Sequence, residues 1–248
     1  MAGLELVTDE GYRIDGRLPT ELRRIRCRLG VFSQADGSSY LEQGNTKILA
    51  AVYGPHEPSS NMRGQILSDK AFLNCEYSQA TFSTAERKHR SRGDRKGQEL
   101  SMHIKQTFEA AILTELYPRS QIDIYLQVLH SDGSNYCVCV NAATLALIDA
   151  GIALKDFVCA CSVSVHKSIA LKDINRVEEN SNCPELMAAM LPKLDQIIYV
   201  EQNGRLHADE MSKALETVSS GCQDIFILLD TAVQDHVRDL TTNIGGDV

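Results

Sequence analysis

Two long amphipathic helical patterns lie among many short strand-like segments, and this order limits the chain to folds that pack sheets and helices in layers. The first pattern runs from about Arg95 to Leu116, with Asp94 as its candidate N-cap and Pro118 just after its end. The second spans roughly residues 208–239, with apolar residues at alternating spacings of four and three. That spacing could form a coiled-coil seam, but it is more typical of a helix that lies on a sheet.

The segments around these helices alternate apolar and polar residues, which is typical of half-buried strands. We predict strands over residues 24–29, 40–42, 47–53, 73–78, 122–129, 157–165, 169–174 and 196–200. The tripeptide Asp36-Gly37-Ser38 is a hairpin-turn signal. A short buried helix is predicted over Ala142–Asp149, closed by Gly151. Because strands precede, separate and follow the helices, the predicted class is α/β (α+β).

Composition narrows the class of protein. The chain has 248 residues, of which 43% are hydrophobic and 23% charged, and this excludes a disordered or fibrous protein. Its length suits one large domain or two closely packed halves. No apolar run approaches the roughly 20 residues of a spanning helix, and residues 1–9 lack a secretion signal pattern. The eight cysteines lie mostly in apolar segments without CxxC spacing, so we expect reduced core thiols in a soluble intracellular protein.

A basic run, Arg87 to Lys96, stands out in a chain of net charge −8, because six of its ten residues are Lys or Arg. The rest of the chain carries 19 basic and 32 acidic residues. An isolated basic run can be an ordinary solvated loop. This one leads directly into the start of the first helix, where backbone N–H groups already favour an anion. A polyanion site is therefore favoured, and a second cluster (Arg23, Arg24, Arg26 and Arg28) adds slightly to it.

Few other segments indicate a specific chemistry. The carboxylates of Asp173, Glu178 and Glu179 could hold Mg²⁺ or supply an acid or base, although such a cluster is more often an exposed turn. No Walker loop, GxSxG, HExxH or GxGxxG element is present. The pentapeptides at 36–40 and 132–136 are similar, which fits a duplicated βα unit or chance.

Motifs in a fixed order along nearly the whole chain resemble the RNase PH family. They are Asp15-Gly-Arg17, Ala35-Asp-Gly-Ser38, Gly44-Asn-Thr-Lys47, Val52-Tyr-Gly-Pro55, Phe82-Ser-Thr84, Glu86-Arg-Lys88, Pro118-Arg-Ser-Gln-Ile-Asp-Ile124, Asn141-Ala-Ala-Thr144 and Asp149-Ala-Gly-Ile152. The resemblance implies an RNase PH-type fold (ribosomal protein S5 domain 2-like), in which duplicated βα units form mixed sheets packed with helices. It further implies an extended segment over 1–20, an N-terminal domain over 21–151 and a C-terminal domain over 152–248, packed as one unit.

Active members of that family degrade RNA from its 3′ end with inorganic phosphate as the attacking group. By resemblance, the family's phosphate-holding arginine falls on Lys96, its Gly-Ser-Arg loop on Ser134-Asn135-Tyr136, and its two aspartates on Asp173 and Glu179. Only Asp173 is unchanged. Lysine lacks the planar fork of arginine, tyrosine removes a positive charge, and glutamate is longer by a methylene. We therefore expect a degenerate site with no catalytic residue, no metal and no cofactor.

Retained RNA binding is the expected function, through cations that contact phosphates without reading bases. These residues are Arg63, Arg87, Lys88, Arg90, Arg92, Arg95 and Lys96. Within the family the chain is similar to ring subunits of the eukaryotic RNA exosome. The resemblance implies a hetero-hexameric ring of RNase PH-type subunits, RNA-binding cap subunits, an associated hydrolytic 3′→5′ nuclease and single-stranded RNA as partners. It also implies roles in rRNA processing and mRNA decay, in nucleus, nucleolus and cytoplasm, and no contact with a membrane.

Two other functions stay open at this point. One is an active phosphate-dependent 3′→5′ exoribonuclease, with Mg²⁺ and inorganic phosphate, in which Lys96 replaces the arginine and a partner supplies the cation missing at Tyr136. The other is a small-molecule enzyme such as a kinase on a similar scaffold. The lack of a Gly-rich nucleotide loop makes the second much less favoured.

Overall fold

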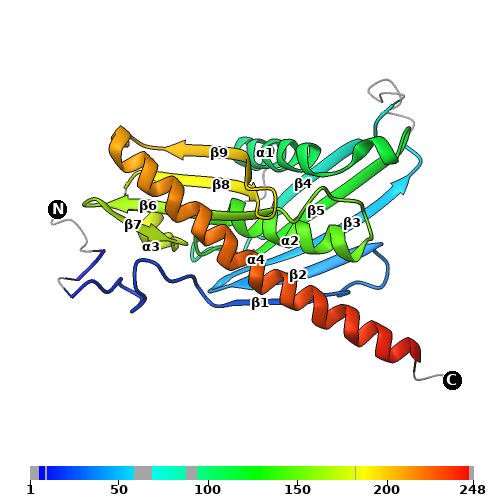
Figure 1. Ribbon diagram of the computed structural model, residues 1–248, viewed down its shortest axis with the longest axis horizontal. Coiled ribbons are helices and arrows are strands. Elements are labelled where there is room, and N and C mark those ends of the chain that lie inside the picture. Colours follow the sequence, from blue (N-terminus) through cyan, green and yellow to red (C-terminus); the bar gives the residue numbers. More distant parts are fainter. Residues whose placement is uncertain (1–5, 9, 59–68, 88–93, 182, 246–248) are drawn as a thin grey trace.

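The computed structural model describes residues 6–8, 10–58, 69–87, 94–181 and 183–245, and it consists of two β-sheets with helices packed against them (Figure 1). The strands are β1 (Ile25–Leu29), β2 (Gly37–Gln43), β3 (Thr46–His56), β4 (Phe72–Gln79), β5 (Gln121–His130), β6 (Cys159–His166), β7 (Ile169–Lys172), β8 (Glu185–Leu191) and β9 (Gln196–Asn203). The helices are α1 (Arg95–Ala111), the 3₁₀ turn η2 (Thr114–Leu116), α2 (Asn135–Asp149), α3 (Arg176–Glu179) and α4 (Ala208–Gly245). None of the helices described is long and apolar enough to cross a bilayer.

The first sheet has five strands in the order β1-β2-β3-β5-β4, antiparallel except for the parallel pair β4–β5. Burial alternates along β3, where Ile48, Ala50 and Val52 are fully buried and their neighbours are not. Period-two alternation puts these residues on one face, and α1 and α2 pack on that face. The opposite face carries the partly exposed Tyr53 and Tyr125.

The second sheet is antiparallel in the order β7-β6-β8-β9, and α4 lies along it (Figure 1). The buried stripe of α4 contains Val218, Cys222, Ile225 and Leu229, which confirms a helix on a sheet. Contact with β6 is close at Gly221, where an added Cβ would lie 2.7 Å from the Cys161 Sγ. The same helix continues past the second sheet and contacts β1 of the first.

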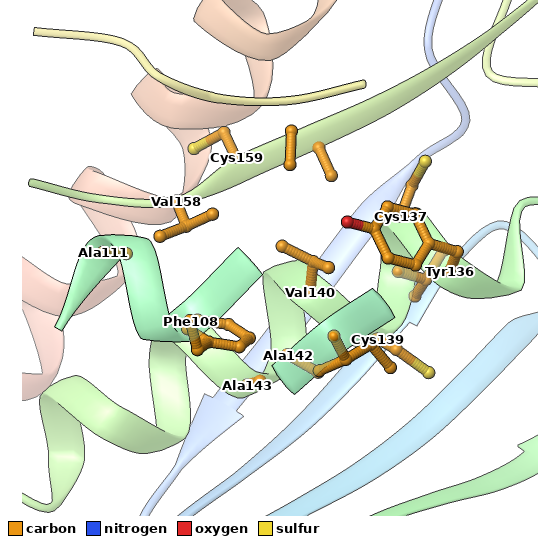
Figure 2. Close-up of a cluster of buried hydrophobic side chains, with 14 of the residues drawn as sticks. Phe108, Ala111, Tyr136, Cys137, Cys139, Val140, Ala142, Ala143, Val158 and Cys159 are labelled. Atoms are coloured by element: carbon orange, nitrogen blue, oxygen red, sulfur yellow. The ribbon is translucent and has the colours of Figure 1, made fainter. Parts of the chain in front are cut away.

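Helix α2 joins the two sheets, because it contacts β2 and β3 of the first and β6 and β8 of the second. Every residue from Tyr136 to Leu147 is buried, which explains why this segment is mostly apolar and has no polar face. Figure 2 shows Cys139, Val140 and Ala143 of α2 among Phe108 of α1 and Val158 near the start of β6. All eight cysteines are free thiols, five of them buried. One core therefore connects both halves of the chain.

Several local predictions were wrong at their boundaries. Gly37 and Ser38 lie inside β2 and not in a turn. The glycine is needed for close packing against α2, since a Cβ there would be 2.3 Å from the Ala146 carbonyl oxygen. Helix α1 ends at Ala111, since the backbone at Ile112 turns extended and bridges to Leu154. Helix α2 begins at Asn135, seven residues before the predicted start.

Strand β8 was not predicted, because nearly all of its residues are buried and it shows no alternation. The two similar pentapeptides are also not equivalent: residues 36–40 lead into a strand, whereas residues 132–136 lead into a helix. The domain boundary at 151 stays a prediction, although β1–β5 precede it and β6–β9 follow it.

Candidate functional site

The start of α1 presents exposed cations. Arg95 and Lys96 occupy its first turn, which contains no acidic residue, and Arg87 is also exposed. Asp94 is the N-cap residue, but its side chain makes no capping hydrogen bond. A positive side chain at a helix N-terminus is repelled by the positive end of the helix dipole, which is unfavourable by about 0.3–1 kcal/mol. Because nothing in the first turn offsets this positive charge, the start of α1 favours the binding of an external anion. The other predicted RNA-binding residues, Arg63, Lys88, Arg90 and Arg92, lie outside the described residues.

The loop before α2 packs directly against the segment that follows β7. Gly133 has a φ of 86°, and a Cβ there would lie 2.6 Å from the carbonyl carbon of Asn175. The Ser134 hydroxyl donates to the Ile174 carbonyl at 2.9 Å and also hydrogen-bonds the Ser162 hydroxyl. Asn135 donates from its side chain to the Ser131 hydroxyl at 2.8 Å. The structure therefore brings the predicted phosphate-loop position next to the predicted carboxylate segment.

Tyr136 points away from this junction into the core. Its ring is 2% exposed, and its hydroxyl lies 2.7 Å from the Thr107 hydroxyl of α1. The ring also packs on Tyr199 of β9, with centroids 5.1 Å apart. Burial raises the pKa of Tyr136, so the side chain is neutral. Figure 2 shows it among core side chains of α2. This side chain therefore offers no charge to an anion.

Asp173, which the resemblance gives as the one unchanged residue, is paired with Arg23. Its Oδ2 accepts hydrogen bonds from the Arg23 backbone N–H at 2.9 Å and from Nε at 3.0 Å, and its Oδ1 accepts from Nη2 at 2.7 Å. Burial alone would raise the pKa of Asp173, but the Arg23 guanidinium holds it below its usual value. Arg23 was predicted as part of a polyanion-binding cluster, and this is wrong, because it is 6% exposed and paired.

Two more arginines from the N-terminal segment bind the same turn. The Arg13 Nε donates to the Glu178 carboxylate at 2.7 Å, and its guanidinium also donates to the carbonyls of Lys172 and Asp173. Arg17 donates to the Asp173 carbonyl at 3.2 Å. The interpretation of 173–179 as an exposed turn is therefore wrong for Asp173 and Glu178, which are both 1% exposed.

Mg²⁺ does not fit these residues as they stand. A metal at Asp173 would have to displace the Arg23 guanidinium from both carboxylate oxygens. Among the residues that the structure describes, no three His, Cys, Asp or Glu side chains are grouped to hold a metal ion. Glu179 is exposed and lies on α3, outside this ion pair.

Sequence reasoning missed Glu185, the first residue of β8. It is 8% exposed, and its Oε1 has no hydrogen-bond partner among the described residues. Burial, with a smaller contribution from the charge of Glu179, raises the pKa of Glu185 to about 7. Since the strand itself was not predicted, no sequence signal pointed to this carboxyl group.

Comparisons with known proteins add a family context to this geometry. Residues 21–153 match the RNase PH family, described as "3' exoribonuclease family, domain 1". The chain is 55% identical over 245 residues to "Exosome complex component RRP41" of Homo sapiens, covering 99% of this chain and 100% of that protein. It is 36% identical over 242 residues to "Exosome complex component Rrp41" of Methanopyrus kandleri, covering 98% and 97%.

Two solved structures are similar. Rice Rrp46 superposes with a TM-score of 0.80 at 26% identity, covering 90% of this chain and 100% of that one. The structure entitled "archaeoglobus fulgidus exosome with RNA bound to the active site" gives a TM-score of 0.75 at 18% identity, covering 87% and 92%. At that identity the second similarity shows the fold alone.

Proposed function

Because the chain belongs to the RNase PH family, we propose that it is a ring subunit of the RNA exosome that binds and guides single-stranded RNA without cleaving it. Its partners are other RNase PH-type subunits in a hetero-hexameric ring, RNA-binding cap subunits and an associated hydrolytic 3′→5′ nuclease. The complex acts in rRNA processing and mRNA decay in the nucleus, nucleolus and cytoplasm. The relatives named as exosome components, aligned over almost the whole chain, support this assignment.

One observation carries the non-catalytic part of the proposal: Tyr136, on which the resemblance places the family's phosphate-binding arginine, is buried. Its hydroxyl is bound to Thr107 and its ring to Tyr199, so it cannot stabilise a phosphate dianion. The pairing of Asp173 with Arg23 agrees with this, because that carboxylate is not free to take a proton or a metal. The proposed subunit therefore needs neither a metal nor another cofactor.

Exposed cations at the start of α1 support the RNA-binding part. Arg87, Arg95 and Lys96 are all exposed, in a chain that is acidic elsewhere. Side chains of this kind bind phosphates irrespective of base sequence and lose affinity as salt is raised. The proposed role is contact with the RNA backbone as the strand passes.

The test uses the native complex isolated through a tag on this chain. RNA labelled at its 3′ end is incubated with and without inorganic phosphate, and the released nucleotide is identified. We expect nucleoside monophosphates whose release does not depend on phosphate, both in the wild type and in a Lys96→Ala variant. Nucleoside diphosphates that require phosphate and disappear with Lys96→Ala, but not with the control Lys213→Ala on α4, would overturn the proposal.

An active phosphorolytic exoribonuclease is the second candidate, and Glu185 is the observation that favours it. A buried carboxyl group with a pKa of about 7 beside a second carboxylate has the properties of a general acid or base. In this case Glu185→Gln abolishes phosphate-dependent release of diphosphates in the same assay. If the complex releases only monophosphates, Glu185 has no such role.

A further inference from the structure

A pocket of about 660 Å³ lies on the first sheet, on the face opposite α1 and α2. On β3 and β5, Val52 and Ile124 are buried on the helix side, so the adjacent residues Tyr53 and Tyr125 point to the other face. The pocket is lined by Asp36, Tyr53, His56, Asp123 and Tyr125. It is separate from the junction of Ser134 and Asp173, since β5 begins near the pocket and ends near that junction.

The two tyrosines supply the aromatic part of the pocket. Their ring centroids are 5.8 Å apart and the rings meet edge to face at 75°. Tyr53 is 37% exposed and Tyr125 is 39% exposed, so aromatic surface is accessible to a ligand. The negative face of such a ring attracts a cation, and a flat guanidinium can also stack on it.

Carboxylates supply the charge. Asp123 accepts hydrogen bonds from the side-chain amides of Asn74 at 3.0 Å and Gln121 at 2.7 Å, and lies 3.3 Å from the His56 Nε2. The exposed Asp36 carboxylate accepts a hydrogen bond from the Gly54 N–H at 2.8 Å. None of the described residues that line the pocket is Lys or Arg.

A further carboxylate lies beside the pocket. Glu76 of β4 pairs in register with Tyr125 and is exposed. Burial raises the pKa of Tyr125, and the charges of Asp123 and Glu76 raise it further, as expected for a hydroxyl near anions. The pocket is therefore acidic and aromatic, and it would repel an RNA phosphate.

We propose that this pocket binds an arginine or lysine side chain of a partner protein. The cation would lie on the open tyrosine surface, in the field of Asp36, Asp123 and Glu76, an arrangement that favours a cation over an anionic group. Charge complementarity thus selects a basic segment of another protein over RNA. The inference rests on the pocket alone and is independent of whether the chain guides RNA.

The test places the photo-crosslinker benzoylphenylalanine at Gln127, two residues from Tyr125 on the same face of β5, so that the pocket itself is unchanged. The tagged chain is expressed in cells, irradiated within its native complex and analysed by mass spectrometry. We expect a link to a peptide of another protein with Arg or Lys within two residues of the linked position. Links only to RNA, to a second copy of this chain or to peptides without a basic residue would overturn the proposal. So would an absence of links when the probe at exposed Leu116 does link.

Two substitutions then test the chemistry of the pocket. Tyr125→Ala and Glu76→Gln should each lower the yield of that crosslink at least fivefold, whereas Glu216→Gln on α4 should leave it unchanged. Thermal unfolding of each variant verifies that it is folded. If Tyr125→Ala is unstable, the test depends on Glu76→Gln, which should fold normally because Glu76 is exposed. An unchanged yield in a folded Glu76→Gln variant would contradict a role for the acidic groups.

Discussion

Three arginines near the start of the chain bind the turn that follows β7. Arg13, Arg17 and Arg23 donate to Glu178 or to the carboxylate and carbonyl of Asp173, so a segment rich in charge is nevertheless buried. A buried ion pair is not by itself stabilising relative to apolar residues, but breaking it leaves an unpaired charge in the interior. In this chain Asp173 compensates the charge of Arg23.

The first prediction follows from that pair. Asp173→Asn should lower the free energy of unfolding by about 3–5 kcal/mol, because it leaves Arg23 buried without a counter-charge. The matched control is Asp15→Asn, which removes the more exposed partner of Arg17 and should cost less than about 1 kcal/mol. Urea denaturation of both variants measures the difference. Equal midpoints for the two variants would show that the Arg23 pair is not needed for stability.

The second residue-scale prediction concerns pH. The pKa of Glu185 is about 7 in the folded chain, above its unfolded value of about 4.5, so the folded state binds the extra proton between these values. Stability from this group is therefore present at low pH and is lost as pH rises through 7. Between pH 5.5 and 8, Glu185→Gln should remove about 2 kcal/mol of the pH-dependent change in unfolding free energy. A variant with the same pH dependence as the wild type would contradict this.

At the scale of elements, α4 is held against β6 by the absence of a side chain at Gly221. Gly221→Ala puts a methyl group 2.7 Å from the Cys161 Sγ, and such overpacking should cost about 1–3 kcal/mol. Cys161→Ala in the same chain should restore part of this loss. Gly97→Ala on α1 is the opposite case: its methyl group would meet only ordinary contacts, and the change should stabilise the helix by up to about 1 kcal/mol. Thermal unfolding distinguishes the two glycines, and equal effects would contradict the packing argument.

Sequence patterns predicted the elements whose burial is one-sided. The stripe on α4 and the alternation on β3 have the periods of a helix and a strand that are buried on one face. Strand β8 and the first half of α2 escaped correct prediction, because burial on all sides removes the period. The pairs Arg13–Glu178 and Arg23–Asp173 join residues 165 and 150 positions apart, and no local pattern encodes such a contact.

At the scale of the whole molecule, positive and negative side chains lie on different surfaces. The cations at the start of α1 face outward, whereas the tyrosine face of the first sheet is acidic. Arg95→Ala combined with Lys96→Ala should therefore weaken binding of the complex to single-stranded RNA and make it less salt-dependent. The slope of log affinity against log salt should fall by about 0.7 for each RNA phosphate that the protein no longer neutralises. Fluorescence anisotropy at several salt concentrations measures it, with Lys213→Ala as the control. An unchanged slope would place the RNA elsewhere on the complex.

The arginines of the N-terminal segment also determine when that segment can form its native contacts during synthesis. Arg13, Arg17 and Arg23 leave the ribosome early, but each of them has a partner in the turn at 172–178, in the C-terminal half. At roughly 5–20 residues per second, the first residues wait about ten to thirty seconds for the turn that will bind them. During that interval the three guanidinium groups lack the partners that this turn supplies. Arg13 and Arg23 are thus among the last residues to acquire all their native contacts, and a stalled or truncated product ending before residue 172 cannot bury them as the finished protein does.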